Sequence, residues 1–154
     1  MHKTLNAAIL FCLMVSASQS SAVIGESPVE CALRYGEPFK QNGDTVWFKK
    51  EPYEVMVTFY QEKAEKVAIK KPIPFDSKGQ PFSDKEIQDF LNANSKGAPW
   101  KEGPPDEVTK NKNWKTENGQ LLATYVTGGD LQLNLLMVNS QECLDRFMKK
   151  QMGK

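Results

Sequence analysis

The stretch Tyr53-Glu54-Val55-Met56-Val57-Thr58-Phe59-Tyr60 alternates strictly between two sets of side chains. This period of two, in a run rich in β-branched and aromatic residues, predicts a strand with one face buried. The face that we expect to be buried carries Tyr53, Val55, Val57 and Phe59, and the other carries Glu54, Met56, Thr58 and Tyr60. The rest of the fold is built outward from this strand.

Strand-like runs flank this stretch on both sides. Thr45–Lys50 precedes it across the turn Glu51-Pro52, and Glu65–Lys71 follows it across Gln61-Glu62-Lys63. Because connections this short join antiparallel neighbours, the three runs predict a meander.

Each half of the chain also carries a helix signal. Ser27 and Glu30 form a capping box at the start of a helix that we expect over Pro28–Tyr35. Ser83 and Glu86 repeat the box before a second apolar stripe. Capping boxes of this kind mark helix N-termini, so two helices are expected at these places.

The second half then repeats the strand pattern. Residues 101–113 are polar and rich in glycine and proline, and we interpret them as a long loop. The strands expected after it are 114–116, 121–126 and 131–138, and a final helix is expected over 140–152.

This order predicts an α+β fold. We expect an antiparallel sheet from two helix-plus-three-strand units, with the helices packed on one face and a C-terminal helix. The mature chain, residues 23–154, is then a single domain. Its units span 27–71 and 83–139, and helix 140–152 follows them.

Residues 1–22 have the three parts of a secretory signal peptide. A short basic start precedes the uncharged apolar run Ala7–Val15, and small polar residues follow. We expect cleavage before Val23, with cleavage after Ala17 as a second option. The apolar run falls well short of the roughly 20 residues that span a bilayer, so no transmembrane anchor is expected after cleavage. The protein is then exported, and is periplasmic or secreted.

Cleavage changes which chemistry the chain contains. It removes His2, Lys3 and Cys12, and leaves a chain without histidine and with equal numbers of basic and acidic residues. Balanced charge argues against nucleic acid or an anionic membrane surface as the partner. Triads and dyads that need histidine are excluded, and so is a zinc site of four cysteines. We therefore expect no cofactor, no metal and no catalytic residue.

Two cysteines remain in the mature chain, Cys31 and Cys143. An even number in an exported protein favours a disulfide between them, and two separate buried thiols are the alternative. Each lies in the same pattern, E-C-x-x-R-aromatic, which occurs over 30–35 and again over 142–147.

A resemblance extends from the first of these patterns. Its residues are Arg34-Tyr35-Gly36-Glu37-Pro38, Trp47-Phe48, Tyr53-x-Val55-x-Val57-x-Phe59, Lys63-Ala64 and Val67-x-Ile69. This series resembles the module of β-lactamase-inhibitor proteins and of small outer-membrane assembly lipoproteins. It is also similar to uncharacterised exported bacterial proteins that open with E-C-x-x-R-Y-G-x-P. The resemblance covers residues 28–71 and implies inhibition of a secreted enzyme as one possible activity. The lipoprotein cysteine is absent here, so membrane tethering is not implied.

Carboxylates are the remaining candidates for catalysis. General acid–base chemistry needs only a pair of them, and the chain offers Asp84, Glu86, Asp89, Asp106 and Glu107. We interpret the first three as part of a capped, solvated helix and the last two as loop residues. A small carboxylate-dependent hydrolase stays an alternative function.

The function that we favour is a non-enzymatic binding or structural module. Met56 and Tyr60 lie on the strand face opposite the expected core, so they would face water or a partner if the helices cover only one side. With Trp100 they form the candidate partner-binding face. The expected partner is another protein of the envelope or exterior.

Overall fold

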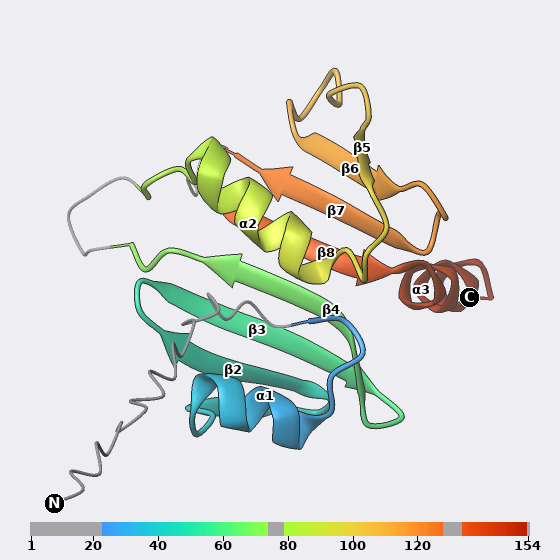
Figure 1. Ribbon diagram of the computed structural model, residues 1–154. Coiled ribbons are helices and arrows are strands. Elements are labelled where there is room, and N and C mark those ends of the chain that lie inside the picture. The colour runs from blue at the N-terminus through green and yellow to red at the C-terminus, as the bar shows by residue number, and fades with distance from the viewer. Residues whose placement is uncertain (1–22, 74–78, 128–133, 154) are drawn as a thin grey trace, which may run out of the picture.

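In the computed structural model, which describes residues 23–73, 79–127 and 134–153, the strands form one antiparallel sheet in the order β1-β2-β3-β4-β8-β7-β6-β5 (Figure 1). The first half of the chain contributes α1 (Pro28–Tyr35), β1 (Lys40–Asn42), β2 (Thr45–Lys50), β3 (Tyr53–Tyr60) and β4 (Lys63–Lys70). The second half contributes α2 (Asp84–Asn94), β5 (Trp100–Glu102), β6 (Lys112–Thr116), β7 (Leu121–Val126) and β8 (Leu135–Ser140), and α3 (Gln141–Met152) follows.

The expectation of two helix-plus-three-strand units is wrong. Each half adds a three-residue edge strand, β1 or β5, so the eight strands form one continuous sheet. Every β1 side chain is exposed, which leaves no apolar alternation for a sequence pattern to detect. β5 begins at Trp100 and extends into the segment that we expected to be a loop. The two halves join where β4 pairs with β8, with Ile69 opposite Leu136.

The capping boxes are confirmed, because both depend only on residues close in sequence. The Ser27 amide donates to the Glu30 carboxylate at 2.7 Å, and the Ser27 hydroxyl accepts from the Glu30 amide. Ser83 and Glu86 make the same pair of bonds ahead of α2. Each box satisfies backbone donors that the first turn of a helix leaves free.

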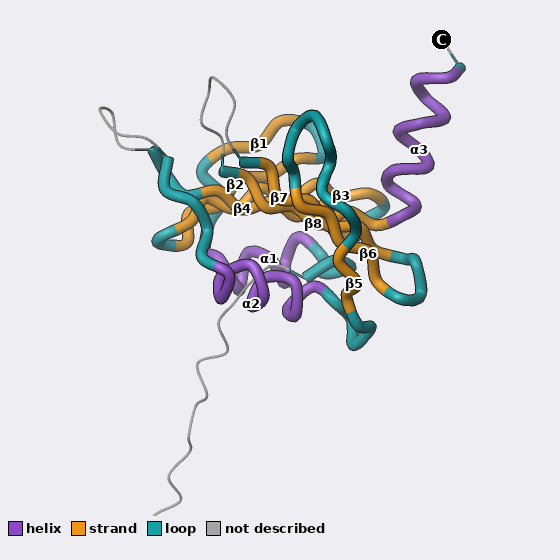
Figure 2. Tube along the Cα trace, turned by 90° about the horizontal axis from the view of Figure 1, so that it is seen from above, coloured by secondary structure: helices purple, strands orange, loops and turns teal. Residues whose placement is uncertain are grey.

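α1 and α2 cover the same face of the sheet. α3 follows β8 and extends away from the end of the sheet on the opposite side (Figure 2). The apolar face of β3 and β4 packs beneath the two helices, as the alternation predicted. The core joins both halves of the chain and includes Cys31, Phe48, Val57, Val67, Ile87, Phe90, Leu91, Leu136 and Val138. No helix in the described ranges has the length and apolarity needed to cross a lipid bilayer.

The later bounds differ modestly from those expected. β4 begins at Lys63, and a register shift between Thr58 and Phe59 gives it one extra residue opposite β3. β8 is described only from Leu135 onward, so part of the strand expected over 131–138 lies outside the described residues. The signal peptide expected over 1–22 also lies outside them.

Candidate binding face

The side of the sheet that α1 and α2 leave uncovered is the candidate site, and we call it the open face. Its central row runs in register across four strands: Trp47 lies opposite Met56, Met56 opposite Ala68, and Ala68 opposite Met137. Neighbours in such a row have Cβ atoms about 5 Å apart, so their side chains touch. The pairing of β4 with β8 therefore makes one apolar surface from both halves of the chain.

This central row is partly exposed. Trp47, Met56 and Met137 are each partly buried, while Ala68 between the two methionines is almost completely covered. The Lys40 ammonium lies 4.9 Å from the centroid of the Trp47 ring. Such a contact holds the indole ring in place while leaving part of it accessible.

Helix α3 contacts one end of the open face through Arg146. The guanidinium of Arg146, on α3, lies over the Tyr60 ring and forms an ion pair with Glu65 of β4. No α3 residue is buried. Phe147, Met148 and Met152 are exposed by 57%, 53% and 74%, so α3 adds apolar surface beside this end of the sheet.

The three residues expected to form a partner-binding face do not lie together. Met56 and Tyr60 are both on the open face, as their place in the alternation indicated. Trp100 instead pairs with Thr116, packs against the core, and donates from its indole nitrogen to the Leu91 carbonyl at 2.7 Å. It helps fasten α2 to the sheet on the covered side.

Other members of the face were missed. Trp47 lies between the buried Val46 and Phe48, so strand alternation places it on the face opposite the core, where Met56 also lies. The sequence pattern alone could therefore have assigned Trp47 to this face. Met137 had no comparable signal, because only the pairing of β8 with β4 brings it into the same row as Met56.

Cys31 and Cys143, the pair for which a disulfide is expected, are both free thiols in the structure. Cys31 is a residue of α1 and is fully buried, on the covered side. Cys143 lies in the first turn of α3, is partly exposed, and lies near Lys66 of the open face. The two thiols thus lie on opposite sides of the sheet, which explains why their similar sequence contexts do not bring them together. Burial raises the pKa of both thiols, to about 12 for Cys31.

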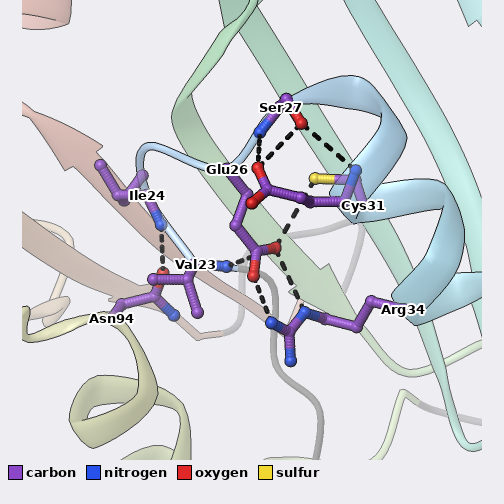
Figure 3. Close-up of polar contacts among 8 residues, drawn as sticks. Val23, Ile24, Glu26, Ser27, Cys31, Arg34 and Asn94 are labelled. Carbon is purple, nitrogen blue, oxygen red and sulfur yellow. Dashed lines mark hydrogen bonds and ion pairs between the residues drawn. The ribbon is translucent and has the colours of Figure 1, made fainter.

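The first E-C-x-x-R pattern builds a structural cluster around Glu26 (Figure 3). The Glu26 carboxylate forms an ion pair with Arg34 and accepts from its Nε at 3.2 Å. It also accepts from the Val23 amide at 3.4 Å, and the Cys31 sulfur lies 3.8 Å from it. These contacts hold the segment before α1 against the helix.

A buried amide continues this anchor into the second half of the chain. The Asn94 side chain accepts from the Ile24 amide at 3.2 Å and donates to the Phe90 carbonyl at 3.0 Å. The second copy of the pattern makes a similar contact: Arg146 forms an ion pair with Glu65, as Arg34 does with Glu26. The shared pattern therefore places an arginine that attaches each helix to a glutamate.

Four of the five candidate catalytic carboxylates, Asp84, Glu86, Asp89 and Asp106, have structural partners. None of Asp84, Glu86, Asp89, Asp106 and Glu107 is buried. Burial alone would raise the pKa of Glu86, but hydrogen bonds from Ser83, Tyr53 and Lys71 lower it to about 2. Asp106 accepts from the amides of its own loop, and these bonds lower its pKa. Within the described residues, no three His, Cys, Asp or Glu side chains are grouped as metal ligands.

A shallow hollow of about 210 Å³ lies on the covered side, between α1 and the turns of the first half. Its walls include Val46, Phe48 and Phe59, and its rim includes Asp44 and Glu62. The hollow and the open face are therefore on opposite sides of the sheet.

The comparisons with known proteins give structural similarities only. No protein-family model and no curated protein match the sequence. The fold is similar to a DUF4309 family protein, YjgB, from Bacillus subtilis, at 8% identity and a TM-score of 0.42, over 75% of this chain and 78% of that one. It is also similar to a cysteine-rich secretory protein, SAV1118, from Staphylococcus aureus, at 12% identity and a TM-score of 0.43. That match covers 79% of this chain and 46% of the staphylococcal protein. The resemblance to inhibitor and assembly-lipoprotein modules is not confirmed by these matches.

Proposed function

We propose that this chain is an exported, non-enzymatic protein-binding module that holds its partner on the open face. The observation that carries the proposal is the central row, where Trp47, Met56 and Met137 remain partly exposed, with Ala68 between the two methionines. Export rests on the three-part pattern of residues 1–22.

The composition of the row supports a protein partner. Tryptophan and methionine are enriched in protein interfaces, and tryptophan is frequent among the residues that carry most of the binding energy. Methionine adapts its shape to a partner because its side chain is unbranched. α3 supplies further apolar side chains at the end of the face, in Phe147 and Met148.

The test is recovery of the partner from the host envelope or medium with the tagged full chain. Trp47→Ser and Met56→Ser should each lose the partner, because they remove apolar surface from the row. Leu33→Ser is the matched control: Leu33 is 84% exposed on α1, on the covered side. Thermal unfolding of each variant, followed by circular dichroism, shows whether the fold is retained.

The result can also separate the proposal from its alternatives. A partner that is lost with Leu33→Ser and kept with Trp47→Ser would contradict the open face as the site. If the partner is a secreted enzyme whose activity falls on binding, the protein is an inhibitor. Hydrolysis by the chain that depends on Glu86 or Asp89 would favour the hydrolase.

A further inference from the structure

Several lysines lie around the central row of the open face. Strand alternation and register place the following lysines around the central row: Lys40, Lys49, Lys66, Lys70, Lys101 and Lys115. Among the described strand residues of this side, the carboxylates are Glu54 and Glu65. Both are already paired, Glu54 with Lys70 at 2.8 Å and Glu65 with Arg146. Lys101 is paired with Glu117 at 3.2 Å, so the lysines of this group without an ion pair among the described residues are Lys40, Lys49, Lys66 and Lys115.

The covered side carries charges of both signs. α2 presents Asp84, Glu86 and Asp89 in its first two turns, and α1 presents Glu30. Several basic residues there form ion pairs, as Lys85 does with Asp89 at 2.6 Å and Lys71 does with Glu86 at 2.9 Å. The acidic side chains of the covered side are thus partners for basic residues of the same side.

Lys66 is the clearest unsatisfied charge on the open face. It lies in the interior of the sheet, opposite Thr58 on β3 and Asn139 on β8, and its side chain is partly buried. No carboxylate of the described residues forms an ion pair with it. An ammonium group without a counter-ion in its own chain favours an anion supplied by a partner.

We infer that the partner of the open face is a protein segment that combines acidic and apolar side chains. The inference rests on the proposed function and specifies the chemistry of the partner. An apolar centre surrounded by charged residues is the usual anatomy of a protein–protein interface. Nucleic-acid sites belong to domains that are basic overall, and this chain is nearly neutral. Carboxylates on the partner would meet Lys66 and Lys115 while its apolar side chains cover Met56 and Met137.

The probe is a library of short random peptides, selected on the immobilised full chain. The enriched peptides should be rich in Asp and Glu together with Leu, Phe or Met. Binding of an enriched peptide, measured by fluorescence anisotropy, should weaken about tenfold or more in Lys66→Gln/Lys115→Gln. The matched control is Lys85→Gln/Lys112→Gln, which removes the same charge from the covered side and should bind normally. Added salt should weaken binding, because it screens exposed charges.

Each outcome separates the inference from the proposed function. Enriched peptides that are neutral or basic, and whose binding is lost with Met56→Ser, would overturn the acidic partner but retain the binding face. Failure to enrich any peptide that depends on Met56 or Lys66 would overturn both. Tighter binding to duplex DNA or to phosphatidylserine vesicles than to any acidic peptide, lost in Lys66→Gln/Lys115→Gln, would overturn the protein segment in favour of that class.

Discussion

The guanidinium carbon of Arg146 lies 3.7 Å from the centroid of the Tyr60 ring. This contact and the ion pair with Glu65 attach α3 to the sheet, since the helix has no buried residue. We expect Arg146→Gln to loosen α3 by about 1–2 kcal/mol, the range for a cation–π contact with a neighbouring ion pair. Hydrogen exchange should then accelerate at the α3 amides and stay nearly unchanged in β3 and β7. The control is Lys150→Gln, also on α3, and equal exchange rates in the two variants would contradict this attachment.

The two thiols should differ in reactivity. Cys143 is partly exposed, whereas Cys31 is fully buried with its pKa raised to about 12. Because the thiolate is the reactive form and must be reached by the reagent, we expect Ellman's reagent to label Cys143 in the native protein. Cys31 should react only after unfolding. Cys143→Ser should abolish native labelling and Cys31→Ser should leave it intact; denatured, unreduced protein without any free thiol would show that the disulfide forms after all.

Glu86 should make stability depend on pH in the acid range. Its pKa is about 2 in the folded protein against an ordinary value of 4.5, because Ser83, Tyr53 and Lys71 hydrogen-bond to the charged form. A lowered folded pKa contributes stability that is complete above about pH 4.5 and is lost as the pH falls toward 2. Glu86→Gln should cost about 1 kcal/mol at pH 7, the scale of a helix N-cap interaction, and progressively less in acid. Urea unfolding at several pH values measures this, with exposed Glu107→Gln as the control; a pH-independent difference would contradict the assignment.

The N-terminus should be found at Val23 in the exported protein. The Val23 nitrogen lies 3.4 Å from the Glu26 carboxylate, so cleavage before it would create an α-ammonium group beside an acceptor. An adjacent negative charge favours the charged form of that group. Mass spectrometry of the exported chain checks the cleavage site, and retention of residues 1–22 in the exported protein would contradict it. Glu26→Gln should lower the thermal midpoint of the cleaved chain, because it also removes the charge that pairs with Arg34.

Local signals predicted the elements that depend on neighbours in sequence. The bounds of α1, β2, β3 and β7 agree with those expected from capping residues and alternation. β1 and β5 were missed, because an exposed three-residue edge strand is defined by backbone pairing with its neighbour rather than by its own side chains. The long-range pairing of β4 with β8 was likewise beyond any local pattern.

The candidate site was predicted in part for the same reason. Alternation within β3 placed Met56 and Tyr60 opposite the core. It could not place Trp100, whose strand is too short to show a period and whose indole is fixed by a hydrogen bond to α2. It could not place Cys31 relative to Cys143 either, because nothing in the pattern around each cysteine states on which side of the sheet its helix will pack.

The sequence by itself determined where helices begin, which side of each long strand is apolar, and which chemical groups the chain contains. Capping bonds span three residues and the pleat has a period of two, so both are properties of short segments. The tertiary structure alone decided that β4 lies beside β8, which aligns Met56 with Met137 across Ala68. It also decided that Lys40, Lys49, Lys66 and Lys115, which are distant in sequence, lie on one side of the sheet. Strands distant in sequence pair because this buries their apolar faces against the same two helices.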